Sequence, residues 1–195
     1  MTSGRLAALS LAIAVVALAP RAHAAAFGAD ELMRQLAAVQ GSRATFVETR
    51  HSALLKEPLA LRGSLIYRRP AFIEKHVIQP YDERITIDGD SLSLENRTRG
   101  RKLKTSVSGS PGIAALVEGI RATRAGELAT LERHYAVQVE GSAARWSLTL
   151  KPLEDEVSRY VAAIVVSGAQ SRISRVEVQE AGGDRAVMDI REEIK

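Results

Sequence analysis

The sequence contains no cysteine in its 195 residues, and only 4% of its side chains are aromatic. The lack of cysteine excludes disulfide scaffolds, zinc–thiolate sites, iron–sulfur clusters and thiol nucleophiles. It also excludes the attachment of a lipid to a cysteine after export. Apolar residues make up 46% of the chain, which is an ordinary share for a soluble domain. A core with so few aromatic rings must therefore be largely aliphatic.

Long hydrophobic runs are also scarce, and the one that occurs lies near the N-terminus. Residues 6–19 carry no charge, and residues 22–24 (Ala-His-Ala) fit the small-x-small pattern of a signal-peptide cleavage site. The run is shorter than the roughly 20 residues that a transmembrane helix needs. We therefore interpret residues 1–24 as a cleavable signal peptide and residues 25–195 as a single domain exported to the periplasm. An uncleaved N-terminal anchor is the alternative.

The chain has little excess charge of either sign. Its formal net charge is +4, and Arg5 and Arg21 lie in the segment that cleavage would remove. Domains that bind nucleic acid usually show a strongly basic balance. We therefore expect no nucleic-acid partner.

Motifs that would indicate enzyme chemistry are missing as well. His51, His76 and His134 do not stand at the His-x-His or His-x-x-x-His spacing of metal sites. The sequence also has no Gly-x-Ser-x-Gly elbow, the turn that exposes the serine of many hydrolases. We expect no catalytic residue, no metal and no cofactor. An exported hydrolase is the alternative from a different class, and it would require a nucleophile–base pair.

The apolar periodicity predicts two or three helices. Residues 30–39 place apolar side chains every three or four positions, which is typical of an amphipathic helix. A second helix is expected to begin at the Ser-Pro pair 110–111 and to be interrupted at Gly126. Residues 127–131 add one or two further helical turns. We interpret the acidic run 154–156 as a solvated loop.

Between these helices the apolar period changes to two, which predicts about eleven strands. Short turns such as Asp88-Gly89-Asp90 join neighbouring strands, and this spacing favours antiparallel pairing because parallel strands need long crossovers. A sheet of this size must curl, with helices over one face, and the periodicity leaves open whether a packed core or a cavity lies between them. The expected strands are residues 44–50, 59–67, 72–78, 84–88, 91–94, 103–107, 137–139, 146–151, 161–166, 173–178 and 186–190.

One short segment is strongly basic. Arg97, Arg99, Arg101, Lys102 and Lys104 surround a predicted turn. One explanation is a docking patch that binds an acidic partner or anionic lipid headgroups. The other is an edge hairpin whose charges prevent it from pairing with another chain. The second explanation is the more economical one.

Several ordered motifs resemble one known family. Residues 63–70 (Gly-Ser-Leu-Ile-Tyr-Arg-Arg-Pro), the Gln-Pro pair 79–80 and residues 87–92 (Ile-Asp-Gly-Asp-Ser-Leu) follow one another as they do in LolA-like periplasmic carriers of outer-membrane lipoproteins. Residues 44–46 and 146–152 resemble the flanking strands of that family. The similarity extends over nearly all of residues 25–195 in the order of elements, and it is most specific over residues 63–92.

The resemblance implies a fold and a function. The fold is an α+β, incomplete antiparallel β-barrel with helices as a lid over a hydrophobic cavity. The function is to take acylated cargo from an inner-membrane ABC-type release complex and to deliver it to an outer-membrane acceptor, and we expect a monomer. The arginine before the proline, which helps to hold the lid closed in this family, corresponds to Arg69, with Arg68 as the alternative.

The cavity lining is expected to combine apolar residues of the strands and of the second helix, although ordinary core is the default interpretation for each of them taken singly. Leucines stand at positions where the family commonly has aromatic rings, so a non-protein lipid (polyene, glycolipid or fatty-acyl conjugate) is an alternative cargo. A periplasmic sensor of lipids or lipoproteins is a further alternative. The candidate lining residues are Phe46, Leu65, Tyr67, Phe72, Leu92, Leu94, Ile113, Leu116, Val117, Trp146 and Leu148.

Overall fold

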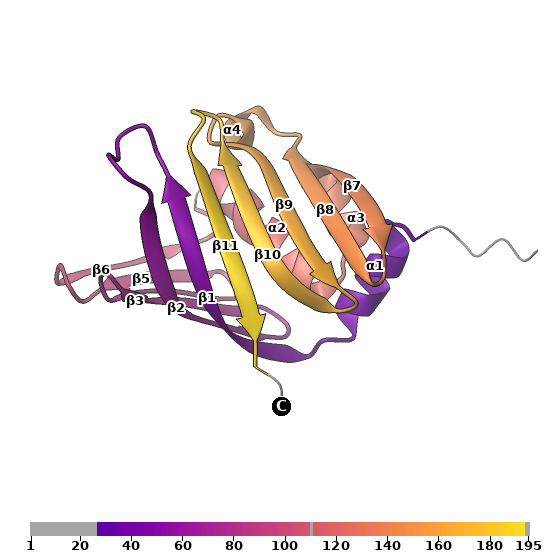
Figure 1. The fold of residues 1–195 in the computed structure, drawn as a ribbon, viewed down its shortest axis with the longest axis horizontal. Helices are drawn as coiled ribbons and strands as arrows, with labels where there is room; N and C mark the ends of the chain where they lie inside the picture. The colour runs from indigo at the N-terminus through magenta and orange to yellow at the C-terminus, as the bar shows by residue number, and fades with distance from the viewer. Residues whose placement is uncertain (1–26, 110, 194–195) are drawn as a thin grey trace, which may run out of the picture.

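The computed structural model describes residues 27–109 and 111–193, which form one antiparallel sheet of eleven strands together with four helices (Figure 1). The expected signal peptide, residues 1–24, and the expected helix cap Ser110 lie outside the described residues. The strands are β1 (Gly41–His51), β2 (Leu59–Arg68), β3 (Phe72–Gln79), β4 (Glu83–Asp88), β5 (Ser91–Asn96), β6 (Arg101–Ser106), β7 (Tyr135–Ser142), β8 (Arg145–Pro152), β9 (Val161–Ala169), β10 (Arg172–Glu180) and β11 (Arg185–Glu192).

The sheet consists of two meanders joined side by side. Strands β1 to β6 form one, which we call the N-terminal arm, and strands β7 to β11 form the other, the C-terminal arm. The arms join where β1 pairs with β11, with Phe46 opposite Ile190. Strands β6 and β7 are the two edges, so the sheet is open. The predicted fold class, eleven antiparallel strands in an incomplete barrel, is confirmed.

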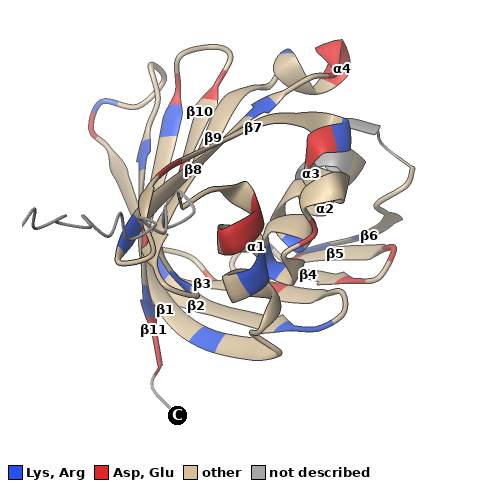
Figure 2. Cartoon of the chain, turned by 90° about the vertical axis from the view of Figure 1, so that its right-hand side faces the viewer, with Lys and Arg blue, Asp and Glu red and all other residues tan. Residues whose placement is uncertain are grey.

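The helices lie inside the curl of this sheet. Helices α2 (Pro111–Ala125) and α3 (Leu128–His134) carry the chain from edge strand β6 to edge strand β7, and α1 (Ala29–Ala37) precedes β1. Figure 2 looks into the curled sheet and shows these three helices between the two arms. We call α1, α2 and α3 the lid. Gly126 separates α2 from α3 at φ +72°, a left-handed conformation that glycine adopts without steric cost.

A fourth helix forms where a solvated loop was expected. Helix α4 (Asp155–Ser158) is a single turn after β8. Asp155 and Glu156 lie in its first turn, where negative side chains interact favourably with the helix dipole. Val157 is buried and anchors the turn to the protein. The acidic run is therefore the start of a short helix. The apolar residue that follows it, Val157, was the sign in the sequence that this segment packs against the protein.

The main core lies between the lid and the C-terminal arm. Helix α1 contributes Leu32 and Leu36, and strand β8 contributes Trp146, Leu148 and Leu150, all of them almost fully buried. Since burial of one such side chain is worth about 1.5–3 kcal/mol, this cluster fixes the lid onto the C-terminal arm.

The concave face of the N-terminal arm carries two smaller clusters. One consists of Phe46, Leu61 and Val77 from β1, β2 and β3. The other joins Ile87 of β4 to Val117 of α2 and also includes Val107. The lid therefore touches the N-terminal arm near β4, and the sheet between β4 and the main core is not fully covered by helix.

Candidate functional site

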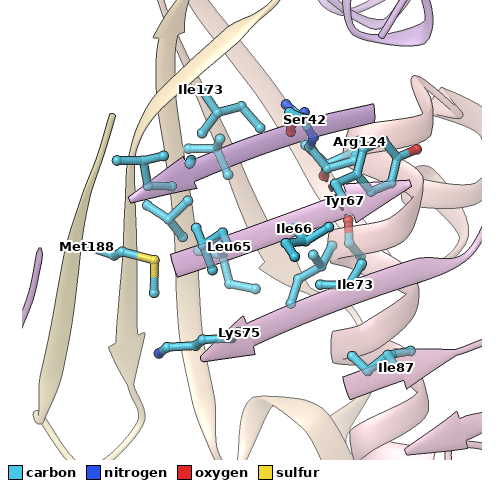
Figure 3. Close-up of a pocket in the computed structure, with 18 of the residues that line it drawn as sticks. Ser42, Leu65, Ile66, Tyr67, Ile73, Lys75, Ile87, Arg124, Ile173 and Met188 are labelled. Carbon is cyan, nitrogen blue, oxygen red and sulfur yellow. Dashed lines mark hydrogen bonds between the residues drawn. The ribbon is translucent and has the colours of Figure 1, made fainter. Parts of the chain in front are cut away.

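An apolar cavity of about 320 Å³ lies between helix α2 and the middle of the sheet. Strands from both arms form its floor, including Leu65 and Ile73 from the N-terminal arm and Val166 and Ile173 from the C-terminal arm. Figure 3 shows Leu65, Ile73 and Ile173 pointing into one common space. The volume is at the lower end of the range of small-molecule sites, about 300–1,000 Å³.

The composition of α2 explains why this space is not filled. The helix presents Gly119, Ile120 and Thr123 to the cavity, and two of these three residues are small. A Cβ atom on Gly119 would lie 2.8 Å from the ring of Tyr135. The helix can therefore approach Tyr135 of β7 this closely only because residue 119 is a glycine. The helix thus rests on the C-terminal arm and leaves the floor of the sheet uncovered.

A polar cluster occupies one end of the cavity. The guanidinium of Arg124 donates a hydrogen bond to Ser42 Oγ at 2.6 Å and lies 3.5 Å from Glu192 Oε1. It also stacks over the ring of Tyr67, 4.9 Å from the ring centroid. Ser42 and Tyr67 are opposite each other on β1 and β2. The residues that line the cavity therefore include a buried cation with one carboxylate and two hydroxyls beside it.

A second ion cluster lies at the other end of the lining. Lys75 on β3 pairs with Glu48 on β1, which also pairs with Arg50. Burial raises the pKa of Glu48, but Lys75 and Arg50 outweigh burial, so the pKa lies below the ordinary value of 4.5. Figure 3 shows Lys75 and Met188 away from the group of Ser42, Tyr67 and Arg124.

Arg69 connects the N-terminal arm to the lid. Its guanidinium donates hydrogen bonds to the carbonyl oxygens of Ala37 at 2.7 Å and Ala125 at 2.9 Å. These residues are the last of α1 and α2, where helix carbonyls lack partners and a positive charge is favourable. Arg68 instead stacks on the ring of Phe72, 3.9 Å from its centroid. Of the two candidate arginines, Arg69 is therefore the one that contacts the lid.

The structure places the predicted lining residues in several environments. Leu65 and Tyr67 line the cavity. Trp146 and Leu148 belong to the main core beneath the lid, while Phe46 and Val117 belong to the two smaller clusters. None of these four is among the described residues around the cavity.

The remaining candidates differ in which face of the sheet they occupy. Phe72 is paired with Arg68 and Asp88, so it lies on the face opposite to the cavity, because alternate residues of a strand point to opposite faces. Leu92 and Leu94 are on the concave face but lie beyond the cavity. The side chains of Ile113 and Leu116 are outside the described part of the chain.

Three charged residues of the lining were missed by the sequence analysis, and Glu192 is one of them. Arg124 follows Val117 and Ile120 by seven and four residues, so it continues the apolar face of α2. Lys75 alternates with Ile73 and Val77 on the inward face of β3. Arg124 and Lys75 each place a charge where the apolar pattern requires an apolar residue. That mismatch could have identified both from the sequence.

The histidines and the acidic residues show ordinary local pairing. His76 lies 2.8 Å from Asp82, and His134 lies 2.6 Å from Glu154. Within residues 27–109 and 111–193, no three His, Asp or Glu side chains form a group suited to a metal ion. In the same part of the chain, no helix has the length and apolar character required to cross a membrane.

The model of a family described as outer membrane lipoprotein carrier protein LolA-like matches residues 21–188. No curated protein matches the sequence significantly. A LolA superfamily protein from Nitrosomonas europaea is similar in structure over 87% of this chain and 94% of its own, with 11% identity and a TM-score of 0.46. A domain from Vibrio parahaemolyticus described as an outer membrane lipoprotein-sorting protein is similar over 85% and 92%, with 10% identity and a TM-score of 0.44.

Proposed function

Because the chain belongs to the family of LolA-like outer membrane lipoprotein carriers, we propose that it is a periplasmic carrier of acylated cargo. It holds the acyl chains in the cavity beneath the lid and moves them from the inner to the outer membrane. The observation that carries this proposal is the apolar cavity between α2 and the sheet.

The energetics of acyl chains suit a site without catalytic groups. Each buried CH₂ is worth roughly 0.8 kcal/mol, so a long chain gains on the order of 10 kcal/mol in any dry pocket. Shielding therefore requires little more than aliphatic walls such as Leu65, Ile73 and Ile173. The difficult step for a carrier is release, and release requires a lid that can open.

Arg69 is suited to regulate that opening. It holds the last carbonyls of α1 and α2 from the end of β2, so the helices cannot leave the N-terminal arm without breaking both hydrogen bonds. At this half-buried site each such bond contributes about 0.5 kcal/mol, the low end of the net range for an intramolecular hydrogen bond. We therefore assign Arg69 as the latch of the lid, weak enough for entering cargo or a membrane partner to open.

The cargo candidates are a lipoprotein and a non-protein lipid. The family favours the first, whereas the cavity of about 320 Å³ favours the second, because this volume suits one small molecule better than several acyl chains. The donor would be an inner-membrane ABC-type complex and the recipient an outer-membrane acceptor. Residues 1–24 would direct export to the periplasm and then be cleaved.

The test is native mass spectrometry of the protein purified from periplasm, followed by lipid extraction. A bound acylated protein supports lipoprotein carriage, and a small bound lipid supports the second candidate. Leu65→Trp, which fills the cavity, should abolish the bound mass. Leu103→Trp, at an exposed position of edge strand β6 that does not line the cavity, should retain it. Empty protein that also fails to take up a fluorescent acyl probe would contradict both forms of the proposal.

A further inference from the structure

Arg124 is the least expected residue around the cavity. Its side chain is only 10% exposed, and it occupies a position on α2 that the helical period reserves for an apolar residue. A buried cation requires compensating partners. Among the described residues, Arg124 has a hydrogen bond to Ser42, an ion pair with Glu192 and the face of the Tyr67 ring.

These partners satisfy the guanidinium only in part. A guanidinium carries five N–H donors, and the described residues accept one hydrogen bond from it. Glu192 lies 3.5 Å away, and its side chain is 21% exposed, so the carboxylate is partly hydrated. Burial accordingly lowers the pKa of Arg124 despite the opposing effects of Glu192 and Tyr67. Several donors therefore remain available to a ligand.

The hydroxyl of Tyr67 is a second and independent sign of a missing partner. Tyr67 is 5% exposed and lines the cavity, yet its buried hydroxyl oxygen has no hydrogen-bond partner. A buried polar group without a partner is rare, because it has lost its water without replacement. Figure 3 shows Tyr67, Arg124 and Ser42 grouped at one end of the aliphatic lining.

We propose that this end of the cavity binds the anionic headgroup of a single-chain lipid, with Arg124 and the hydroxyls of Ser42 and Tyr67 as its ligands. The chain of the lipid then lies along the aliphatic floor. A long-chain fatty acid has this chemistry, because a carboxylate accepts paired hydrogen bonds from a guanidinium. The inference rests on the proposed carrier function and specifies its cargo class.

The other charged end of the lining is a poorer headgroup site. Lys75 pairs there with Glu48, which also binds Arg50, and Lys75 lies over the ring of Phe46, 5.2 Å from its centroid. Neither Lys75 nor Glu48 has a buried side-chain atom left without a partner. The unpartnered hydroxyl is found only beside Arg124 among the lining residues.

The experiment measures how well palmitic acid and its methyl ester displace a fluorescent fatty acid from the purified protein. The two ligands share a chain and differ in headgroup charge. The acid should bind about tenfold or more tightly than the ester, as a charged hydrogen bond predicts. Arg124→Gln should remove this preference, because it weakens binding of the acid far more than binding of the ester. Arg121→Gln, one turn earlier on α2 and paired with Glu118 and Glu127, is the matched control and should preserve it.

Two further variants keep the inference testable if Arg124→Gln fails to fold. Tyr67→Phe removes a hydroxyl without a protein partner, so its melting temperature should be at or above that of the wild type while acid binding weakens several-fold. Glu192→Gln removes the carboxylate that competes for Arg124, so acid binding should strengthen.

Equal binding of acid and ester by the wild-type protein would overturn this inference and leave the carrier function standing. Unchanged acid binding in Tyr67→Phe together with unchanged acid binding in Glu192→Gln would also overturn it. If the protein binds neither the fluorescent fatty acid nor either palmitoyl ligand and is also empty when purified from periplasm, the carrier proposal itself fails, so the two failures are distinguishable.

Discussion

The two arms of the sheet use their concave faces in different ways. In the C-terminal arm, Trp146 and Leu148 are almost fully buried in the main core beneath the lid, and only part of that core, such as Ile164, also lines the cavity. In the N-terminal arm, Leu65 and Ile73 line the cavity and lie outside the main core. Strands of both arms, such as β2 and β8, alternate apolar and polar residues, so the difference arises from where the helices rest and not from the pattern of these strands.

The arms also differ in buried charge. The main core of the C-terminal arm consists of apolar residues, with Tyr135 as its most polar member. The concave face of the N-terminal arm includes Glu48, which is 2% exposed, and its partner Lys75. A buried ion pair adds little stability compared with apolar packing. The comparison teaches that the C-terminal arm is built for stability, while the N-terminal arm gives up part of that stability to form a site.

The largest effect should come from truncating the same side chain in each arm. Leu148→Ala should lower the free energy of unfolding by about 4 kcal/mol, because it leaves a void in a filled core. Leu65→Ala should cost only about 1 kcal/mol, because part of its surface already faces a cavity. Urea titration measures both. Equal losses would show that the two arms are packed alike and would remove the basis of the comparison.

The next largest effect concerns the buried charges of the N-terminal arm. Lys75→Met should cost about 3 kcal/mol, because it removes one partner of the buried Glu48 and leaves Arg50 as the other. Lys102→Met, which removes an exposed pair with Glu95 on the same arm, is the control and should have little effect. If Lys75→Met melts at the wild-type temperature, water reaches Glu48 in the folded protein, and the carboxylate is not the buried charge that its 2% exposure indicates.

Acid stability should depend on the same cluster. The pKa of Glu48 is lowered in the folded protein from 4.5, so ionised Glu48 stabilises the fold above that pH. This contribution disappears as the pH falls through the lowered folded pKa, and each pKa unit corresponds to about 1.4 kcal/mol. The free energy of unfolding, measured from roughly pH 6 downward where this linkage acts, should fall less steeply with pH for Glu48→Gln than for the wild type. The exposed Glu57→Gln should follow the wild type; a Glu48→Gln profile that also does so would contradict the assignment.

The smallest effect on stability should come from the latch between the arms and the lid. Arg69→Leu removes two hydrogen bonds at a half-buried site and should cost about 1 kcal/mol. It should nevertheless speed the release of a bound acyl probe, measured by stopped-flow transfer to vesicles. Arg68→Leu, whose side chain stacks on Phe72 away from the lid, should release at the wild-type rate. Identical rates for the two variants would exclude Arg69 as the latch.

Much of the fold could be predicted from sequence. The alternation in residues 59–67 and the continuous aliphatic run in residues 161–166 predicted strands that the structure confirms as parts of β2 and β9. The short turns predicted antiparallel pairing, because a turn such as 88–90 can join only adjacent strands. The pairing of β1 with β11 was not visible, because a contact between residues this distant in sequence leaves no local signal.

The candidate site was less predictable than the fold. Leu65 and Tyr67 line the cavity, whereas Trp146 with the same alternation is core. Phe72 lies on the opposite face of the sheet. The face is decided by the register in which β3 pairs with β2 after the turn, and the apolar character of Phe72 does not reveal it. Apolar character shows that a residue is buried, but it does not distinguish burial against protein from burial beside an empty space.

The sequence by itself determined the eleven strands, the lid helices and the antiparallel sheet, because periodicity and turn chemistry act over a few neighbouring residues. Its scarcity of aromatic rings also determined that any cavity would have mainly aliphatic walls. Only the tertiary structure decided that the lid rests on the C-terminal arm and leaves a cavity over the middle of the sheet. Only that docking brings Arg124 of α2 beside Ser42 and Tyr67, because such contacts depend on how helices pack across the sheet.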